Sequence, residues 1–360
     1  MHDTADTLTT GMRARIDARI LTTLDETAQA ISPAGIAGTE MVEVLRASAR
    51  GGKRLRALLT VGSHAANGGR YEDEAVTVAA ALEWFQTAAL IHDDVLDGSD
   101  LRRGEPAAHR RFESLYSDVG AEHSAEELGR AAGILAGDVA LMISHRALDS
   151  AIADLPARRE VASLFASMAE LVTAGQYLDM RIASAPLSAL EGQRDDIMAT
   201  MRSKTASYSA EGPLALGAAV AGADSSRIES MRHIGVPLGV AFQLRDDVLG
   251  LVGSPETTGK PAGDDIREGK RTILLWHAWT HGSHAHRAAI GAALGDRQAP
   301  QSQIDAAVEA VIDAGGVDAA EEEIALLVEP ALVELDTLDL APEGAAVLRD
   351  LAVRLTSRSA

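Results

Sequence analysis

The segment Asp73–Leu96 constrains the fold of this 360-residue chain more than any other feature, because it is apolar on nearly every side. Its apolar side chains, among them Leu82, Trp84 and Phe85, do not gather on one face. A helix that is apolar all round lies in the centre of its domain. Ile234–Leu251 has the same character. The sequence therefore predicts helices at the centre of the molecule.

The composition favours an all-α fold. Hydrophobic residues make up 46% of the chain and are mainly Ala and Leu, whereas aromatic residues make up only 3%. Ala and Leu favour helices, and the β-branched and aromatic residues that favour sheets are sparse. Periodicity predicts further helices at Gly11–Ala30, Thr39–Ala66, Leu128–Asp154, Arg158–Ile182, Gln193–Val220 and Gln301–Arg358, the last of these interrupted at Pro330 and Pro342.

The segments between these helices predict one domain. Ser117–Glu127 and Ser254–Glu268 are polar and are expected to be surface loops. No linker is long or biased enough to separate domains, and no repeat is evident. We therefore expect a single helical bundle over residues 1–360, built around a central apolar cavity, with residues 1–10 flexible.

The charge and cysteine content narrow the possible functions. The formal net charge is −20, which argues against nucleic-acid binding because such a surface repels phosphate backbones. The chain has no cysteine, so disulfides and thiolate chemistry are excluded. No signal peptide and no uncharged apolar run of about 18 residues is present. We expect a cytoplasmic protein without a transmembrane segment.

An acidic cluster closes the first apolar helix. Asp93 and Asp97 are four residues apart, and Asp94 is three residues before Asp97, so the three carboxylates crowd one side of a turn. Carboxylates at the end of a buried element need compensating charge. Mg²⁺ suits them, because it is commonly held by one or two carboxylates together with substrate phosphates and water.

A second acidic cluster, Asp246-Asp247, follows the other apolar segment. A single cluster of this kind is more often a solvated helix end. Two clusters, each preceded by a helix that resembles a core element, favour metal binding on opposing walls of one cavity.

Basic residues precede and follow the first acidic cluster. Gly51-Gly52 is followed by Lys53 and Arg56, which together with the start of a helix would suit a diphosphate. The alternative to diphosphate binding is a glycine turn with solvated basic residues. Arg102 and Arg103 follow the cluster and could grip phosphate oxygens, or simply neutralise nearby aspartates.

The order of these motifs resembles that of the trans-isoprenyl diphosphate synthases, which include farnesyl and geranylgeranyl diphosphate synthases. Gly-Gly-Lys-Arg-x-Arg comes first, followed by Asp-Asp-x-x-Asp-x-x-x-x-Arg-Arg-Gly, Lys-Thr, Gln-x-x-Asp-Asp and Gly-Lys-Pro. The matching motifs extend from Gly51 to Thr272. The resemblance implies an all-α homodimer that joins isopentenyl diphosphate head to tail to an allylic diphosphate with more than one Mg²⁺.

The resemblance also implies a role for each matching residue. Isopentenyl diphosphate would be bound by Lys53, Arg56, Gln86 and Arg103. Magnesium would be held by Asp93, Asp94, Asp97, Asp246 and Asp247. The allylic substrate would contact Arg102, Lys204, Thr205, Gln243, Lys260 and Lys270. Catalysis would rest on Asp93, Asp94, Asp97, Arg102, Lys204, Asp246 and Lys260. Gln176 and Asp179 match a further family feature, or are polar helix residues paired with Lys204.

One position departs from the family pattern. The second acidic motif usually ends in a third aspartate, where this chain has Gly250. The downstream run Gly259–Asp265 carries negative charge that could compensate if it reaches the site.

Small side chains before the first acidic cluster predict the product length. Ala89 is one turn before Asp93, Ala88 is its neighbour, and Phe85 lies a turn deeper. One turn rises about 5.4 Å, close to the length of one isoprene unit. Small side chains at these positions would leave the cavity open to a longer chain, which predicts a product of C20 or longer. Alternatively, both alanines are ordinary helix-packing residues.

Two other functions remain open. A class I terpene cyclase uses a similar acidic cluster but has no need of the Gly51–Arg56 site. A non-catalytic subunit of a heteromeric synthase usually loses an acidic cluster, and only Gly250 points that way.

Overall fold

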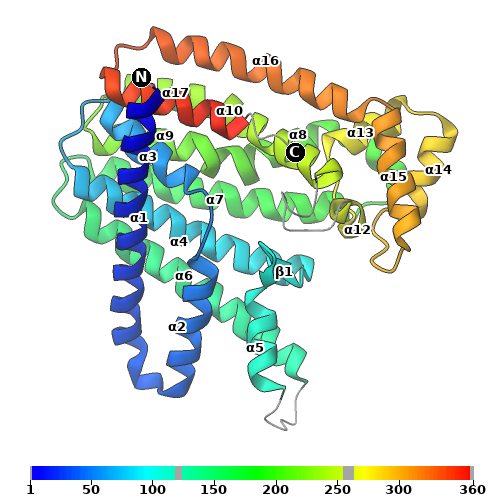
Figure 1. Cartoon of the computed structure of the whole chain (residues 1–360), viewed down its shortest axis with the longest axis horizontal. Helices are drawn as coiled ribbons and strands as arrows, with labels where there is room; N and C mark the ends of the chain where they lie inside the picture. The colour runs from blue at the N-terminus through cyan, green and yellow to red at the C-terminus, as the bar shows by residue number, and fades with distance from the viewer. Residues whose placement is uncertain (1, 118–123, 254–262, 357–360) are drawn as a thin grey trace. The chain divides into compact units, whose positions relative to one another are not determined.

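Helices make up nearly all of the computed structural model, which describes residues 2–117, 124–253 and 263–356 (Figure 1). The predicted all-α class is confirmed. Within the described residues the only strands are β1 (Leu101–Arg102) and β2 (Glu105–Pro106), which form a short antiparallel pair.

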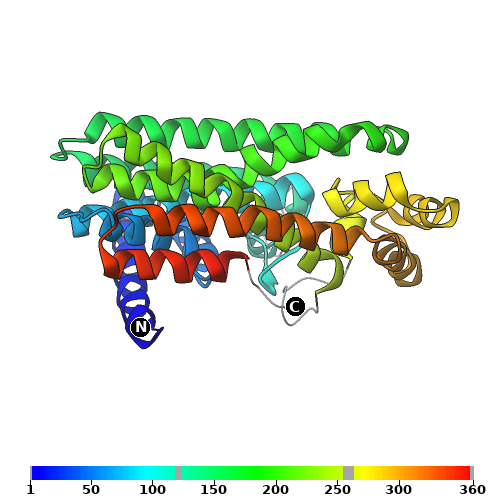
Figure 2. The ribbon, with the colours of Figure 1, turned by 90° about the horizontal axis from the view of Figure 1, so that it is seen from above.

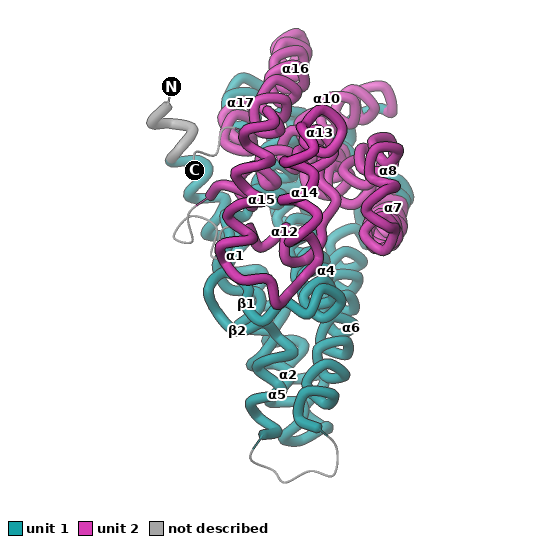
Figure 3. The backbone as a smooth tube through the Cα atoms, turned by 90° about the vertical axis from the view of Figure 1, so that its right-hand side faces the viewer, with its two compact units in different colours: residues 1–163, 216–224, 340–348 teal, residues 164–215, 225–339, 349–360 magenta. Residues whose placement is uncertain are grey.

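The chain divides into two compact units (Figure 3). Unit 1 comprises Met1–Ser163, Leu216–Asp224 and Leu340–Leu348, and unit 2 comprises Leu164–Ala215, Ser225–Asp339 and Arg349–Ala360. Each unit combines segments that are far apart in the sequence. The single domain over residues 1–360 stays a prediction.

Unit 1 is built around the helix that the apolar segment predicted. This helix, α4 (Glu72–Asp97), contacts α1, α3 and α6. Trp84 on α4 is fully buried, and its indole nitrogen donates to Thr23 Oγ1 at 2.7 Å. On the α6 side, Ser144 Oγ donates to the Ala81 carbonyl at 2.7 Å. The other elements that lie wholly in unit 1 are α1 (His2–Ile31), η1 (Ser32–Ala34), α2 (Ile36–Ala49), α3 (Leu55–Ala66), α5 (Ala108–Tyr116) and α6 (Ala125–Ile152).

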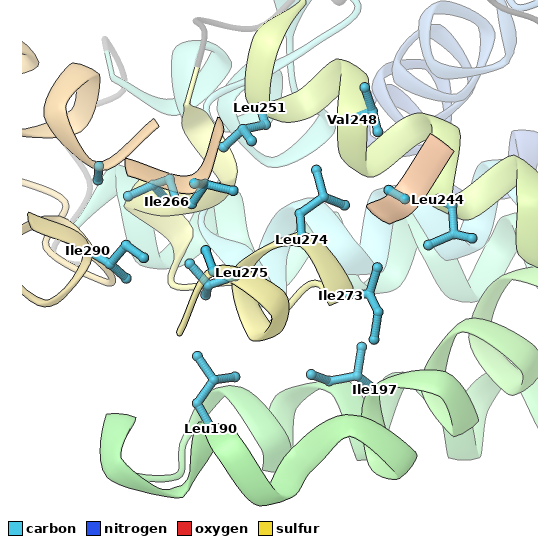
Figure 4. Close-up of a cluster of buried hydrophobic side chains, with 14 of the residues drawn as sticks. Leu190, Ile197, Leu244, Val248, Leu251, Ile266, Ile273, Leu274, Leu275 and Ile290 are labelled. Atoms are coloured by element: carbon cyan, nitrogen blue, oxygen red, sulfur yellow. The ribbon is translucent and has the colours of Figure 1, made fainter. Parts of the chain in front are cut away.

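Unit 2 has its own apolar core, in which side chains from several helices interdigitate (Figure 4). Leu244, Val248 and Leu251 from α10 (Ser225–Val252) pack there with Leu274 of α13. The other elements wholly in unit 2 are η2 (Leu187–Gln193), α8 (Arg194–Thr200), η3 (Met201–Glu211), α12 (Asp264–Glu268), α13 (Ile273–His281), α14 (His284–Ala293), α15 (Gln301–Asp313) and α16 (Gly316–Thr337). The helices α7 (Arg158–Ala183), α9 (Gly212–Val220) and α17 (Pro342–Thr356) contribute residues to both units.

The structure corrects several predicted boundaries. The expected stretch from Thr39 to Ala66 is two helices, because the backbone turns through residues 50–54. The predicted loop at Ser117–Glu127 is shorter, since α6 begins at Ala125, and the loop at Ser254–Glu268 ends in α12. Pro330 lies inside α16 and does not interrupt it. The first helix, α1, begins at His2 instead of the predicted Gly11, and the flexibility of residues 1–10 stays a prediction.

The stretch predicted as a single helix at Gln193–Val220 is irregular in its middle. Its central segment, η3, is a π-helix in which the Gly212 N–H donates to the Ser207 carbonyl, five residues earlier. Runs of this kind are rare and frequently occur at functional sites. Lys204 and Thr205 lie in this segment.

Two helices are long and apolar enough to resemble membrane spans by length and composition alone. They are α4, whose apolar window is 78% buried inside the protein, and α6, whose window is 44% buried. This is weak evidence, because core helices of soluble proteins meet the same criteria, as the central position of α4 illustrates.

The burial of His64 predicts that the stability of the protein depends on pH. Its ring is buried, and Nε2 accepts a hydrogen bond from the Tyr71 N–H at 3.2 Å, at the residue that precedes α4. Burial lowers the pKa of His64 below its usual value of 6.5. His64 therefore binds a proton less readily in the native state than in the unfolded chain.

We expect the His64 contribution to stability to be complete above about pH 6.5. Below that pH the free energy of unfolding should fall by at most about 1.4 kcal/mol per pH unit, and level off below the native pKa. Denaturant titrations of wild type and His64→Gln from pH 5 to 8 measure this difference. The same pH dependence in both proteins would contradict the prediction.

Candidate active site

The first acidic cluster ends α4, and the structure separates its three aspartates. Asp94 is buried, whereas Asp93 and Asp97 are partly exposed. Arg102 donates to Asp94 Oδ1 through Nε at 2.9 Å and through Nη2 in a very short contact. Arg102 Nη2 also lies 3.7 Å from Asp93 Oδ2. The cluster thus presents Asp93 and Asp97 at its surface, while Asp94 holds Arg102.

The turn at the end of α4 and the β1–β2 pair together bring Arg102 to this cluster. Gly98 has a φ of 62°, a left-handed conformation that suits glycine and ends the helix. Its N–H still donates to the Asp94 carbonyl. Arg102 lies on β1, and Arg103 follows with a φ of 56°. Positive φ is uncommon for a residue other than glycine and occurs often at functional sites.

The basic loop before α3 is held by ion pairs of the buried Arg54 side chain. Gly51 and Gly52 have positive φ, and Arg54 also has a φ of 54°. The Arg54 guanidinium donates to Asp17 Oδ1 at 2.8 Å and to Glu83 Oε2 at 2.9 Å. It also donates to the Ala49 carbonyl at 2.8 Å. Arg54 therefore fastens the loop to α1 and α4 instead of pointing to a ligand, a role that sequence reasoning missed.

Arg103 lies against the same loop. Its Nη1 donates to the Arg50 carbonyl at 2.8 Å, and its guanidinium lies so close to Gly52 that a Cβ there would be 3.1 Å away. Partial burial lowers the pKa of Arg103, and the positive charges of Arg54 and Arg102 lower it further. An anion would relieve this concentration of positive charge.

A pocket of about 400 Å³ lies within unit 1 beside these arginines. Its lining includes four arginines and two carboxylates, together with apolar side chains of α4 such as Leu90 and Ile91. The charged residues are Arg50, Arg102, Arg103, Arg111, Asp94 and Glu105. Arg50 and Arg111 were not singled out from the sequence, since neither belongs to one of the motifs. The predicted ligands of isopentenyl diphosphate are thus only partly brought together: Arg103 lines the pocket, whereas Lys53, Arg56 and Gln86 do not.

Unit 2 brings together a second group of predicted residues, most of them on η3 and α10. Gly239 of α10 allows the close approach of these two elements, because a Cβ there would be 2.5 Å from the Ala206 Cα. Thr205 Oγ1 then donates to Gln243 Oε1 at 2.6 Å. Gln243 Nε2 in turn donates to Asp247 Oδ1 at 2.6 Å.

Lys270 completes this network, with its Nζ 3.4 Å from Asp247 Oδ1 and 3.9 Å from Asp265 Oδ2. Burial raises the pKa of Asp247 to about 6, in opposition to the attraction of Lys270. Burial alone would lower the pKa of Lys270, but the carboxylates of Asp265 and Asp247 outweigh it and raise that pKa well above its usual value. Asp246, beside Asp247, is partly exposed.

Lys204 lies where α7 and η3 run side by side (Figure 2). Gly175 of α7 makes this possible, because a Cβ there would be 2.4 Å from the Lys204 nitrogen. The Lys204 ammonium is 2.6 Å from Asp179 Oδ2. The alternative in which Asp179 pairs with Lys204 therefore matches the structure, and Gln176 is partly buried on the same helix. Lys260 lies outside the described residues.

Comparison with known proteins identifies the family. The family model described as polyprenyl synthetase matches residues 39–311. The chain belongs to this family. The predicted resemblance is confirmed: the protein is a trans-isoprenyl diphosphate synthase.

Relatives of known product agree with this assignment. A geranylgeranyl diphosphate synthase of Saccharolobus solfataricus is 31% identical over 72% of this chain and 73% of that protein. A geranylfarnesyl diphosphate synthase of Aeropyrum pernix is 33% identical over 78% of this chain and 82% of that protein. The synthase is thus a prenyltransferase with a product of C20 or longer, and neither the terpene cyclase nor the non-catalytic subunit is favoured.

A solved structure resembles the whole fold. The geranylgeranyl pyrophosphate synthase of Corynebacterium glutamicum, solved with isoprenyl diphosphate and magnesium, has a TM-score of 0.90 and 36% identity to this synthase. The match covers 97% of this chain and 98% of that one.

Proposed function

We propose that the synthase condenses isopentenyl diphosphate head to tail with an allylic diphosphate in a Mg²⁺-dependent reaction. The observation that carries the proposal is the end of α4, where Asp93 and Asp97 are partly exposed and Asp93 lies 3.7 Å from Arg102, which lines the arginine-lined pocket. Carboxylates for a divalent cation and guanidinium groups for diphosphate thereby occur in one place.

The carboxylates of the acidic motifs suit Mg²⁺ even though they do not form a complete set of protein ligands. Within the described ranges, no three His, Asp or Glu side chains are grouped closely enough to hold a metal ion by themselves. Magnesium does not need such a group, because it is usually bound by one or two carboxylates plus substrate phosphates and water. Asp93 and Asp97 would supply these carboxylates in unit 1, with Asp94 beside them, and Asp246 and Asp247 would supply them in unit 2. The solved relative that contains magnesium supports the same choice of metal.

The residues of the chain would direct the bond changes. In the reaction, the allylic C–O bond breaks and diphosphate leaves with the electron pair. The alkene of isopentenyl diphosphate then attacks the allylic carbon, and a proton passes to the departing diphosphate. Bound Mg²⁺ supplies neutralisation of the leaving group's charge. In unit 1, Arg102 would stabilise negative charge on a diphosphate. In unit 2, Lys204 would do so, while Thr205, Gln243 and Lys270 would orient the group. The resemblance assigns charge stabilisation to Lys260 as well. No protein nucleophile is required.

The arginine-lined pocket of unit 1 would receive isopentenyl diphosphate. Arg103 is placed to bind its diphosphate, together with Arg50 and Arg111, which the sequence did not predict. Lys53 and Arg56 remain proposed ligands, since Lys53 lies in the loop that Arg54 holds and Arg56 lies in the first turn of α3. Gln86 remains one as well.

We also propose a cytoplasmic homodimer. Support for the dimer comes from α6, where Ile134, Leu135 and Met142 are exposed although they are large and apolar. Exposed apolar side chains on one helix are typical of protein–protein contacts. The acidic, cysteine-free composition is compatible with the cytoplasm.

The proposed activity is tested by incubating purified protein with labelled isopentenyl diphosphate, Mg²⁺ and a C5, C10, C15 or C20 allylic primer. We expect labelled chains of C20 or longer, and their loss on addition of EDTA with recovery on excess Mg²⁺. The boiled protein is the control. Incorporation that is indifferent to the chelator, or that requires a second protein, would contradict the proposal.

A further inference from the structure

The last two turns of α13 carry a pair of histidines that the proposed function does not use. His277 and His281 are four residues apart, so they lie on the same side of the helix, one turn from each other. Their ring centroids are 4.7 Å apart. One ion can bridge two imidazoles at this separation, because each metal–nitrogen bond is about 2.0–2.1 Å long.

Both imidazoles have nitrogens that are free to bind a ligand. Neither ring forms a hydrogen bond or an ion pair with any residue that the structure describes. His277 is half-buried and His281 is exposed. Position 315, beside Nε2 of His277, is a glycine, and even a Cβ there would be 3.7 Å from this nitrogen. Position 315 therefore contributes no side chain that would cover it.

The surroundings of the pair favour a cation bound by neutral rings. His281 is the last residue of α13, where carbonyl oxygens without helical partners carry partial negative charge. Burial, and next the neighbouring His281, lowers the pKa of His277, against the opposing charge of Glu322 on α16. The His277 ring is therefore neutral at pH 7, as a metal ligand must be. The Glu322 carboxylate would attract a bound cation.

The helix holds the two rings in a fixed relation. Ile273, Leu274 and Leu275 anchor α13 in the core of unit 2 (Figure 4). Thr272 caps the start of the helix, where its Oγ1 accepts from the Leu275 N–H at 3.2 Å. Two ligands on one rigid element act together, because the second nitrogen is already beside the ion once the first has bound it.

We propose that His277 and His281 bind one divalent transition metal, Zn²⁺ or an ion of the same class, with water completing its coordination. Imidazole nitrogen suits zinc, copper and nickel, whereas Mg²⁺ prefers oxygen ligands. The site thus differs in chemistry from the carboxylates that the proposed function assigns to Mg²⁺. A bound ion would fix the last turn of α13 and stabilise the folded protein.

Binding is tested by titrating the full-length protein with ZnCl₂ in a calorimeter, with Mg²⁺ in excess to occupy the carboxylates. We expect a Zn²⁺ site that His277→Gln and His281→Gln each weaken about tenfold or more, since either change leaves one imidazole. His284→Gln is the matched control, because it removes another exposed histidine, at the start of α14, and should leave this site unchanged. Equal affinity in the wild type and both pair variants would overturn the proposal.

Trp276 reports where the ion binds. Its ring lies edge-on to His281, with 5.9 Å between the centroids. Cu²⁺ binds imidazole more tightly than Zn²⁺ does and quenches the fluorescence of a nearby indole. We expect an equimolar amount of Cu²⁺ to quench the wild type, and the quench to be at least halved in His281→Gln and in Trp276→Phe. A quench of full size in both variants would contradict the assignment.

The effect on stability is measured by melting curves with and without Zn²⁺. Saturating Zn²⁺ should raise the Tm of the wild type by about 2–4 °C, because it binds the folded protein and has no such pair in the unfolded chain. The variant with both His277→Gln and His281→Gln should show no rise, and its prenyl transfer without Zn²⁺ should equal that of the wild type. An equal rise in both proteins would place the ion elsewhere and overturn the proposal. These results do not depend on which product the protein makes, so they separate this inference from the proposed function.

Discussion

Asp93→Asn is expected to lower kcat by about 100- to 1,000-fold while leaving the thermal stability of the protein unchanged. Asp93 is partly exposed at the end of α4, with 23% of its side chain accessible, and Arg102 lies 3.7 Å from it. Asparagine keeps the shape of the side chain and removes its charge. The loss of activity would therefore come from weaker binding of the groups that Asp93 holds during the reaction. Steady-state kinetics with isopentenyl diphosphate and a C15 primer, together with a melting curve, measure both effects.

The neighbouring residue provides the control, because Asp94 should behave differently. Its side chain is only 3% exposed, and its carboxylate accepts both bonds that bring Arg102 to the cluster. Asp94→Asn should therefore cost about 1–3 kcal/mol of unfolding free energy, the usual value for a hydrogen-bonded charged group that loses its partner. If Asp93→Asn keeps more than a tenth of the activity, or if Asp94→Asn is as stable as wild type, the division of roles between the two aspartates is wrong.

Ala89→Phe is expected to shorten the product by at least one isoprene unit. Ala89 is partly exposed and lies one turn before Asp93, whereas the next turn down carries the buried Phe85. A phenyl ring at position 89 would project from the open side of α4, where each turn accounts for about 5.4 Å of growing chain. Products that are dephosphorylated and separated by length should change from C20 or longer to mainly C15, at least tenfold in ratio.

Ala88→Phe serves as the comparison, since Ala88 is fully buried. A large side chain there has no open space and should cost about 1–3 kcal/mol of stability through overpacking. It is therefore a poor probe of product length, although the sequence places both alanines on equal terms. If a folded Ala89→Phe variant makes a product of unchanged length, this face of α4 does not determine the length of the prenyl chain.

The features that could be predicted from the sequence depend on local patterns of residue type and not on tertiary contacts. The all-round apolar character of α4 and α10 predicted two central elements, because it depends only on side-chain type and helical period. The acidic and basic motifs predicted candidate residues for the same reason. Thr205, Gln243, Asp247 and Lys270 are far apart in sequence but form one network in unit 2.

The features that were missed arise from backbone conformation and packing. Helical spacing brings Asp93 and Asp94 to the same turn, but it does not show that Asp94 is buried and paired with Arg102. Arg54 carries the same charge as Lys53 in the motif, yet its left-handed backbone turns its side chain towards Glu83. The π-helix η3 leaves no local pattern in the sequence.

The most direct test of the account is the stoichiometry of diphosphate release, measured with a C15 allylic diphosphate in the presence of Mg²⁺. We predict no release without isopentenyl diphosphate, and one diphosphate for each isopentenyl diphosphate consumed, with the product remaining a linear prenyl diphosphate. Release of diphosphate from the C15 substrate alone, with formation of a hydrocarbon or an alcohol, would contradict the account.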